Sequence, residues 1–299
     1  MSGRGLGPRL GKAGGLAIVT GAYGTAVGAA WVAAEVVGPD QPVLALGLGY
    51  LVSALVIYGW SLALDNGSMF DAWWSVLPPV AAVWLAGAAT SAVPDGRVVL
   101  VLVVVGVWAI RLTSNWARDW PGLDHEDWRY LDLYTKGPKP LISLGAVHLF
   151  PAFVVFLGSL PMVPALVWGD RPLGAFDGLA VVIGLSAAVI EFVADEQMRR
   201  FGRVKTPGAV MDQGLWRYSR HPNYFGEILF WWSLWLFAVA SDPAWWWTVI
   251  GPVAMVVMFL AASIPMLDER SRARRPGFGA YADGTSALVP WPTRRKPTS

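Results

Sequence analysis

The chain has 299 residues, of which 55% are hydrophobic and only 15% are charged, and its formal net charge at pH 7 is +2. This apolar content exceeds what the core of a water-soluble domain needs, so it excludes an ordinary soluble enzyme and predicts an integral membrane protein. The chain has no cysteine, which excludes disulfides, thiolate metal sites, iron–sulfur clusters and a cysteine nucleophile.

Eight apolar runs follow one another along the chain, each close to the roughly 20 residues that a membrane-spanning helix needs. The predicted fold is therefore all-α, a polytopic membrane helix bundle with about eight transmembrane helices, or seven if one of the first two runs does not span. The runs cover residues 13–37, 43–64, 72–93, 97–116, 141–166, 173–195, 224–241 and 245–266.

The first apolar run has a second interpretation. It follows Arg4, Arg9 and Lys12, and a basic start before an apolar stretch also describes a secretory signal peptide. The run is longer than the apolar part of a signal peptide, continues in alanine-rich sequence and has no clear polar cleavage region. We therefore interpret it as an uncleaved spanning helix.

The basic residues predict the orientation of the bundle. Eight alternating spans place the start of the chain, the connections 117–140 and 196–223 and the tail after 266 on one side, which then carries 20 of the 23 Lys and Arg residues. Since positively charged connections stay in the cytoplasm, we expect both termini to be cytoplasmic and the protein to lie in a bacterial inner membrane.

Residues that bind metals and nucleotides in soluble proteins lack their usual spacing here. His125, His148 and His221 are far apart in the sequence, which argues against a zinc or di-iron centre. The glycines at 47 and 49 lack a third partner, and Gly11-Lys12 is not followed by Ser or Thr, so neither a Rossmann turn nor a P-loop is present. Any nucleotide must be held by helices.

The most unusual polar segment covers residues 214–227 and reads Gly-Leu-Trp-Arg-Tyr-Ser-Arg-His-Pro-Asn-Tyr-Phe-Gly-Glu, directly before an apolar stretch. Polar groups at the mouth of a spanning helix are costly, and they indicate function. Arginine forks match phosphates, so the basic residues of this side predict a polyphosphate ligand, although anionic lipid headgroups explain the tail cluster 294–296 better. The basic residues near the motif are Arg199, Arg200, Arg203, Lys205, Arg217, Arg220, Arg270, Arg272, Arg274 and Arg275.

Three acids lie within the predicted spans. Glu191 and Asp195 are four residues apart, on one helix face, and Glu227 lies about one turn inside the seventh span. We expect all three to face the bundle interior, where they either bind ribose hydroxyls or a carboxamide or pair with Arg199, Arg217 or Arg220. Asn223, four residues before Glu227, adds a donor and an acceptor to the same face, which suits an amide-bearing ring.

The segment from Trp216 to Glu227 resembles the signature of the steroid 5-alpha-reductase-like membrane family, in a bacterial branch of unknown function. The resemblance covers about residues 65–291 and divides the chain into an N-terminal tail with two spans (1–64), the reductase-like membrane domain (65–291) and a basic tail (292–299). Further similar segments are Asp71-Ala-Trp, Leu77-Pro-Pro, Trp108-Ala-Ile-Arg-Leu, Glu126-Asp-Trp-Arg-Tyr, Glu191-Phe-Val-Ala-Asp-Glu-Gln, Ile264-Pro-Met, Tyr281 and Val289-Pro-Trp.

The resemblance implies an NADPH-dependent oxidoreductase that transfers a hydride to a lipophilic, isoprenoid- or steroid-like enone and takes part in lipid metabolism. The cofactor would lie among the C-terminal helices, open to the cytoplasm. Asn223 and Glu227 match the family's Asn-x-x-Gly-Glu element near the nicotinamide, and Asp195 resembles a cofactor aspartate. The cofactor-binding residues expected from the resemblance and the motif are Glu191, Asp195, Arg199, Arg217, Arg220, His221, Asn223, Tyr224, Glu227, Arg270 and Arg274.

The substrate end departs from the family pattern. Steroid reductases polarise the substrate ketone with a Glu and a Tyr, and the nearest equivalents here are Asp71 and Trp108. Hydride transfer needs a donor at the carbonyl, and the candidate catalytic residues are Asp71, Arg111 and Tyr130. The competing interpretations are that Arg111 only anchors Asp119 or Asp127, and that Tyr130 belongs to the interfacial aromatic belt.

Two other functions use the same residues. Isoprenylcysteine carboxyl methyltransferases, which bind S-adenosylmethionine, share an Arg-His-Pro-x-Tyr-x-Gly element but lack the following Asn and Glu pattern. A non-enzymatic lipid-binding membrane protein leaves the acids and arginines without a purpose. The expected partners are the bilayer and a lipophilic small molecule, with no nucleic acid and no metal.

Overall fold

The computed structural model describes residues 11–293, and it builds them from helices, with one isolated β-bridge between Ser219 and Ser286. This confirms the predicted all-α fold. Eight helical segments are long and apolar enough to cross a membrane, in agreement with the eight apolar runs. Their bounds are α1 Gly11–Val37, α2 Pro42–Leu64, η2–α3 Gly67–Gly87, α4 Asp95–Asp119, α6–η4 Lys139–Trp168, α8 Ala175–Val204, α9 Pro222–Ser241 and η6–α11 Pro243–Arg274.

Three of these spans consist of several helical elements. The third joins η2 (Gly67–Phe70) to α3 (Trp73–Gly87). The fifth consists of α6 (Lys139–Ile142), η3 (Ser143–Leu149), α7 (Phe150–Ser159) and η4 (Pro164–Trp168). The eighth consists of η6 (Pro243–Val249), α10 (Ile250–Met258), η7 (Phe259–Ser263) and α11 (Ile264–Arg274). The short elements α5 (Trp128–Tyr134), η5 (Gly214–Arg217) and α12 (Phe278–Gly284) lie between or after the spans.

Three predicted C-terminal ends were wrong by more than a helical turn, and one of them is the eighth run, which was expected to end at 266 but continues to Arg274 in α11. The sixth run was expected to end at 195, but α8 continues to Val204 because Glu196 pairs with Arg199 and Arg200, three and four residues on, and such pairs support a helix in water. The third run was expected to reach 93, but α3 ends at Gly87. The connection that follows is a turn, in which the backbone N–H of Thr90 donates to Val167.

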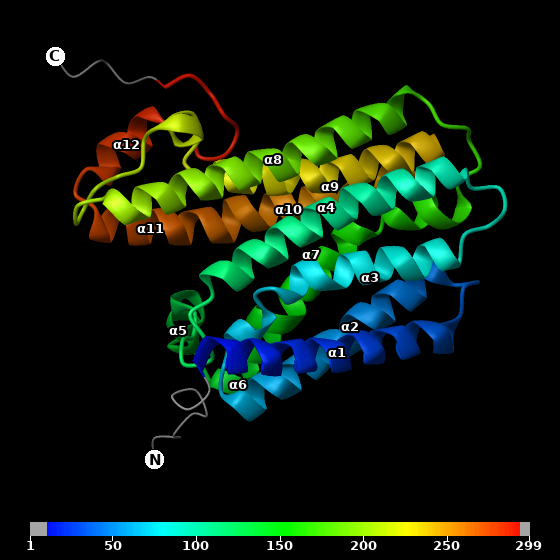
Figure 1. Ribbon diagram of the computed structural model, residues 1–299, viewed down its shortest axis with the longest axis horizontal. Helices are drawn as coiled ribbons and strands as arrows, with labels where there is room; N and C mark the ends of the chain where they lie inside the picture. The colour runs from blue at the N-terminus through cyan, green and yellow to red at the C-terminus, as the bar shows by residue number, and fades with distance from the viewer. Residues whose placement is uncertain (1–10, 294–299) are drawn as a thin grey trace.

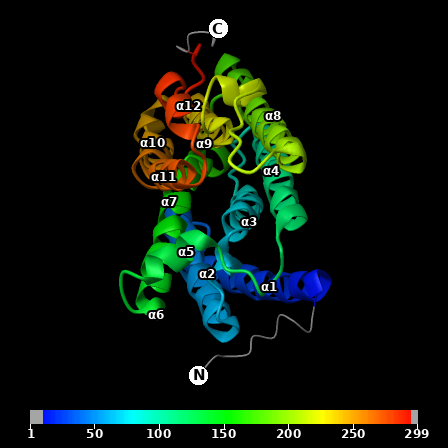
Figure 2. The ribbon, with the colours of Figure 1, turned by 90° about the vertical axis from the view of Figure 1, so that its left-hand side faces the viewer.

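The spans lie alongside one another, and α5, α6 and α12 gather at the end where α1 begins (Figure 1). We call this the basic end, because the arginine-rich connections 117–140 and 196–223 and the end of α11 lie there. Figure 2, which looks at this end, shows α8 to α12 on one side of the molecule and α1 and α2 on the other, with α3, α4 and α7 between them.

Prolines explain two of the three π-helical turns in the fifth and eighth spans, the third being η4. The elements η3 and η7 are π-helical, and each lies immediately before a helix whose second residue is proline, Pro151 in α7 and Pro265 in α11. A proline has no N–H to donate and its ring clashes with the carbonyl four residues earlier. That carbonyl lies within the π-helical turn in both spans, so a wider turn removes the conflict.

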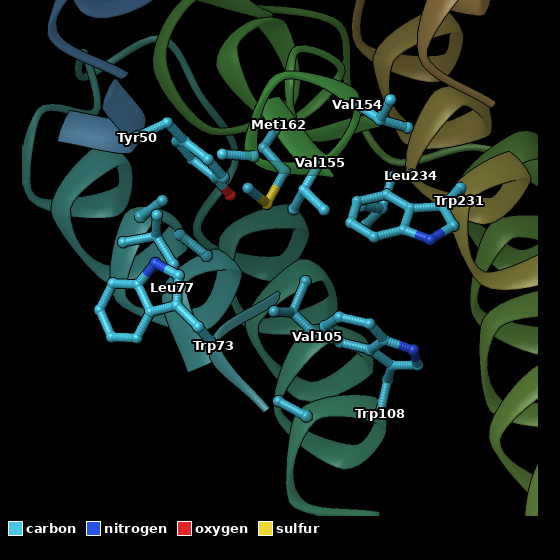
Figure 3. Close-up of a cluster of buried hydrophobic side chains, with 14 of the residues drawn as sticks. Tyr50, Trp73, Leu77, Val105, Trp108, Val154, Val155, Met162, Trp231 and Leu234 are labelled. Atoms are coloured by element: carbon cyan, nitrogen blue, oxygen red, sulfur yellow. The ribbon is translucent and has the colours of Figure 1, made fainter. Parts of the chain in front are cut away.

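The core of the bundle is rich in large aromatic side chains. Trp73, Trp108 and Trp231 are fully buried, and Figure 3 shows them among aliphatic side chains from several spans. Trp108 of α4 stacks on Phe230 of α9, with ring centroids 4.0 Å apart and planes 4° apart. This contact fixes α4 against α9, and it thereby positions the polar residues that both helices carry toward the basic end.

Candidate active site

Polar side chains from α4, α8 and α9 meet in one buried group. We call Arg111, Glu191, Asp195, Asn223 and Glu227 the acid cluster. The Arg111 guanidinium forms ion pairs with both Glu191 and Asp195, and the Asn223 amide lies 3.4 Å from the second oxygen of Asp195. The three acids therefore face the interior, as expected.

The competing interpretation of Arg111, as an anchor for Asp119 or Asp127, was wrong. Arg111 binds neither Asp119 nor Asp127, because α4 lies beside α8 and places residue 111 opposite Glu191 and Asp195. Asp119 is two turns farther along α4, at the basic end, where it pairs with Arg199 at 3.0 Å. The structure thus places Arg111 with the residues expected at the cofactor and away from the expected substrate end.

Two indoles hold Glu227. Trp108 Nε1 donates to Glu227 Oε2 and Trp231 Nε1 donates to Oε1, each over 2.9 Å. Trp108 had been expected at the substrate end with Asp71, as the counterpart of a substrate-binding tyrosine. That expectation was wrong, because its contact with Glu227 places it at the acid cluster. The indole cannot accept a hydrogen bond, so its role at this position is to orient a carboxylate.

A glycine lets α8 and α9 approach each other at the acid cluster. A Cβ atom on Gly226 would lie 2.5 Å from Cγ of Glu191 and 2.9 Å from the carbonyl oxygen of Ala187. Any larger residue would push the two helices apart. The glycine of the Asn-x-x-Gly-Glu element is therefore needed to place Glu191 next to Glu227.

An apolar cavity of about 540 Å³ lies beside the acid cluster. Aromatic and aliphatic side chains form most of its wall, and Asn115 connects it to the cluster because its amide donates to Asp195 over 3.0 Å. The residues that line it are Phe70, Asp71, Trp74, Ser75, Leu112, Asn115, Trp116, Asp127, Arg129, Tyr130, Leu133, Ala146, Phe150, Pro151, Tyr224, Met258, Phe259, Ala262, Ser263 and Met266.

A phenol–carboxylate pair lies at the polar end of this cavity. The Tyr130 hydroxyl donates to Asp71 Oδ1 over 2.5 Å, and Arg129 lies 3.8 Å from the same oxygen. Burial and the adjacent Asp71 carboxylate raise the pKa of Tyr130 well above its usual range. Tyr130 is therefore a neutral donor that faces a cavity, and it is not part of an interfacial aromatic belt.

Arg129 is bound mainly by its neighbour Asp127. Its Nε and Nη2 atoms donate to the two oxygens of Asp127 over 2.8 and 3.1 Å. Although burial alone would raise the pKa of Asp127, these hydrogen bonds and the arginine charge hold that pKa below its usual range. The Asp127–Arg129 ion pair is a neutral unit overall, and it supports the Tyr130–Asp71 pair from the side of the basic end.

The turn between α2 and α3 holds α5 in place. Asn66 donates to the carbonyls of Leu123 and His125, the Gly67 N–H donates to Glu126, and the Ser68 hydroxyl accepts from the Asp127 N–H. Because Asp71 follows this turn directly, the same contacts that fix α5 also bring Tyr130 to Asp71.

The arginines of the motif at 214–227 have structural partners. The Arg220 guanidinium binds Asp268 and the carbonyls of Ala282 and Thr285, so it joins α9 to α11 and the C-terminal segment. His221 Nε2 donates to Oδ1 of the same Asp268 carboxylate over 3.0 Å. Arg220 and His221 therefore do not reach the acid cluster in this structure.

The other expected cofactor residues lie around the basic end. Arg199 binds Glu196, Asp119 and Asn115. Arg217 lies over the Tyr218 ring at 6.0 Å, and Arg270 lies over the Trp128 ring at 3.8 Å. Tyr224 lines the cavity and its ring stacks on His221. Arg274 lies in the last turn of α11.

Asn115 and Arg129 were not predicted as functional residues, and Asp127 was considered only as a partner of Arg111. Asn115 lies four residues after Arg111 on α4, a spacing that places both on one helix face, so periodicity could have found it. Arg129 and Asp127 lie within a segment similar to the reductase family, but nothing in their own pattern connects them to Asp71.

Two buried polar atoms of the acid cluster are available to bind a ligand. Arg111 Nε and Glu191 Oε1 are buried and have no hydrogen-bond partner among residues 11–293. Unpaired buried polar atoms are rare in proteins and call for a partner. One buried donor and one buried acceptor of the acid cluster are therefore open to a ligand.

Comparisons with known proteins place the chain among uncharacterised relatives. A family model described as "Protein of unknown function (DUF1295)" matches residues 57–285. An uncharacterized protein of Schizosaccharomyces pombe is 27% identical, in an alignment that covers 81% of this chain and 79% of that protein. No solved structure matches. The matched region contains both the acid cluster and the lining of the cavity.

Proposed function

This chain belongs to the DUF1295 family, a steroid 5-alpha-reductase-like family, and on that premise we propose that it is a membrane-embedded, NADPH-dependent reductase of a lipophilic enone. The observation that carries the proposal is the juxtaposition of two parts. A buried Tyr130–Asp71 pair faces an apolar cavity, and the acid cluster with its Asn223 and Glu227 lies beside that cavity.

The cavity supports a lipophilic substrate with one polar end. Its wall is mainly aromatic and aliphatic, and its polar groups gather around Tyr130 at the basic end. Ligand sites of this size are commonly apolar, with a few polar groups that fix the orientation of the ligand. A substrate carbonyl would therefore lie at Tyr130 and its apolar body would extend toward Phe259.

The Tyr130–Asp71 pair supports carbonyl activation. Reduction of an enone builds negative charge on the carbonyl oxygen, and a positioned donor stabilises that charge. The phenol has a single proton, which it now donates to Asp71. If Asp71 is protonated, this hydrogen bond reverses, and the phenol proton becomes available to the substrate oxygen.

The acid cluster and the basic end support a bound dinucleotide. NADPH, when bound, supplies the hydride. Asn223, Glu191 and Glu227 would hold its carboxamide, and Asp195 would lie near the ribose. Arg217, Arg270 and Arg274 would hold its phosphates, because their guanidinium groups are not committed to buried acids as Arg220 is.

A ligand-stability measurement tests the proposal. A ligand that binds only the folded state stabilises it by about 2.7 kcal/mol at a concentration 100 times its Kd. We expect NADPH to raise the unfolding temperature of the purified protein in detergent more than NADH does. If S-adenosylmethionine stabilises the protein and NADPH does not, the methyltransferase interpretation replaces the reductase. If neither ligand stabilises it, the interpretation as a lipid-binding protein is favoured.

The structure also selects the variant for this test. Glu227→Gln would point an amide N–H toward an indole N–H, because both Glu227 oxygens accept from tryptophans, so a loss of binding would be ambiguous. Asn223→Ala removes one 3.4 Å contact with Asp195 and leaves the ion pairs of Arg111. We expect it to weaken NADPH binding with little change in the stability of the free protein.

A further inference from the structure

One wall of the cavity is at the outer surface of the bundle. Ala146 in η3, Phe150 at the start of α7 and Ala262 in η7 all line the cavity, yet all three are exposed, Phe150 at 49%. These residues belong to the fifth and eighth spans. All three lie within the apolar runs 141–166 and 245–266, and an exposed apolar side chain in such a run faces lipid, so we infer that the cavity reaches the bilayer at this wall.

The two spans are pinned together at the other end of the bundle. A Cβ atom on Gly251 of α10 would lie 2.3 Å from the carbonyl oxygen of Leu157 and 2.9 Å from Cα of Gly158 in α7. Helices come this close only where both surfaces are small, and packed helices cross at an angle. Their axes therefore separate on either side of this crossing.

The exposed cavity residues lie where the two spans have diverged. Ala262 is eleven residues beyond Gly251, and Ala146 is eleven residues before Leu157, so both lie about 16 Å along their helices from the crossing. Each lies in one of the proline-induced π-helical turns, η3 and η7. Both sides of the opening are thus widened turns with alanine at the surface, which leaves space between the spans.

We propose that the cavity opens sideways into the bilayer between η3 and η7, and that a membrane-dissolved lipophilic molecule enters it there with its apolar body in the lipid. We call this opening the lateral portal. The portal follows from the helix geometry alone, whereas identifying the entering molecule as the reductase substrate rests on the proposed function. The polar end of the cavity, at Tyr130 and Arg129, remains on the side of the basic end, where a charged cofactor approaches from water.

The absence of native cysteine allows a direct test. Leu112→Cys places a single thiol on α4, inside the cavity, where the native side chain is half-buried. The protein is reconstituted in phosphatidylcholine vesicles and treated with N-octadecylmaleimide, which dissolves in the bilayer. The same variant is also treated with a charged, water-soluble thiosulfonate. The rate of thiol modification is measured by mass spectrometry.

A matched pair of substitutions then blocks or spares the portal. Ala262→Trp places a large ring in the opening, whereas Ala261→Trp places the same ring on the neighbouring residue, which is also exposed but does not line the cavity. We expect Ala262→Trp to slow modification by the octadecyl reagent at least tenfold and Ala261→Trp to leave it unchanged. Modification by the aqueous reagent should be the same in both.

Equal rates in the two tryptophan variants, or no reaction with the octadecyl reagent, would overturn the portal. If Leu112→Cys lowers the unfolding temperature, Met258→Cys in α10 provides a second reporter in the wall of the cavity. The readout is chemical and needs no turnover. If Ala262→Trp slows the octadecyl reagent in a protein that NADPH does not stabilise, the proposed reductase function is disproved but the lateral portal is supported.

Discussion

The acid cluster and the cavity lie side by side but are built in different ways. The acid cluster joins three long spans through ion pairs and indole hydrogen bonds, and most of its polar atoms already have partners. The cavity has an apolar wall, and its polar end depends on α5, a short helix held by the turn between α2 and α3. We infer that the cluster is a rigid part that stabilises the fold, and that the cavity is the part where substrates can vary.

The substitution with the largest expected effect removes the cation of the acid cluster. Arg111→Leu would leave Glu191 and Asp195 buried without a cation, which destabilises proteins by about 3–5 kcal/mol when a buried pair loses one partner. We expect a large fall in the unfolding temperature in detergent. Arg118→Leu, on the same helix, is the control. Its guanidinium is half exposed and lies 3.4 Å from Glu196, so it should change stability by less than about 1 kcal/mol. Equal losses would mean that the cluster adds nothing beyond surface charge.

The substitution with the next largest expected effect tests catalysis in the cavity without changing the acid cluster. Tyr130→Phe removes the donor at the polar end, and loss of such a donor slows catalysis by about 100- to 1,000-fold. We expect this loss in NADPH oxidation with a panel of lipophilic enones, without loss of NADPH-induced stabilisation. Tyr134→Phe is the control, since Tyr134 lies on the same helix and binds Glu126 but does not line the cavity. Full activity in Tyr130→Phe would remove the phenol from the mechanism.

The substitution with the smallest expected effect tests whether a tryptophan hydrogen bond to Glu227 matters for cofactor binding. Trp108→Phe keeps an aromatic ring against Phe230 but removes the N–H that binds Glu227. A hydrogen bond to a charged group contributes about 1.5–3 kcal/mol, and we expect about tenfold weaker NADPH binding, or 1.4 kcal/mol. Trp73→Phe is the matched control, because Trp73 is equally buried and its Nε1 has no partner among residues 11–293. If both variants bind NADPH alike, the orientation of Glu227 is irrelevant to the cofactor.

Several features of the acid cluster could be predicted from the sequence. Glu191 and Asp195 are four residues apart, as are Asn223 and Glu227, and this spacing places each pair on one helix face. A carboxylate within a span faces the interior because lipid does not solvate it. These rules identify which residues turn inward, but they do not identify the partner, and the two acids considered as partners of Arg111, Asp119 and Asp127, are not the ones that it binds.

The cavity could be predicted only in part. Asp71 and Tyr130 were recognised as candidates, but their contact depends on Asn66, Gly67 and Ser68, which hold the segment 123–127. No periodicity connects a turn to a helix about 60 residues away. Trp108 was misplaced for the same reason, because the side chain of a residue on α4 can reach either α3 or α9, and only packing selects between them.

The sequence by itself determined the all-α membrane fold, the eight spans and the inward direction of the acids. These depend on apolar length and helical spacing, which are properties of consecutive residues. The tertiary structure decided that Arg111 binds Glu191 and Asp195, that Trp108 holds Glu227, that Tyr130 faces Asp71, and that two glycines pin the spans on either side of the lateral portal. Each of these contacts joins spans that are distant in the chain, and hydropathy does not specify which faces of the helices meet.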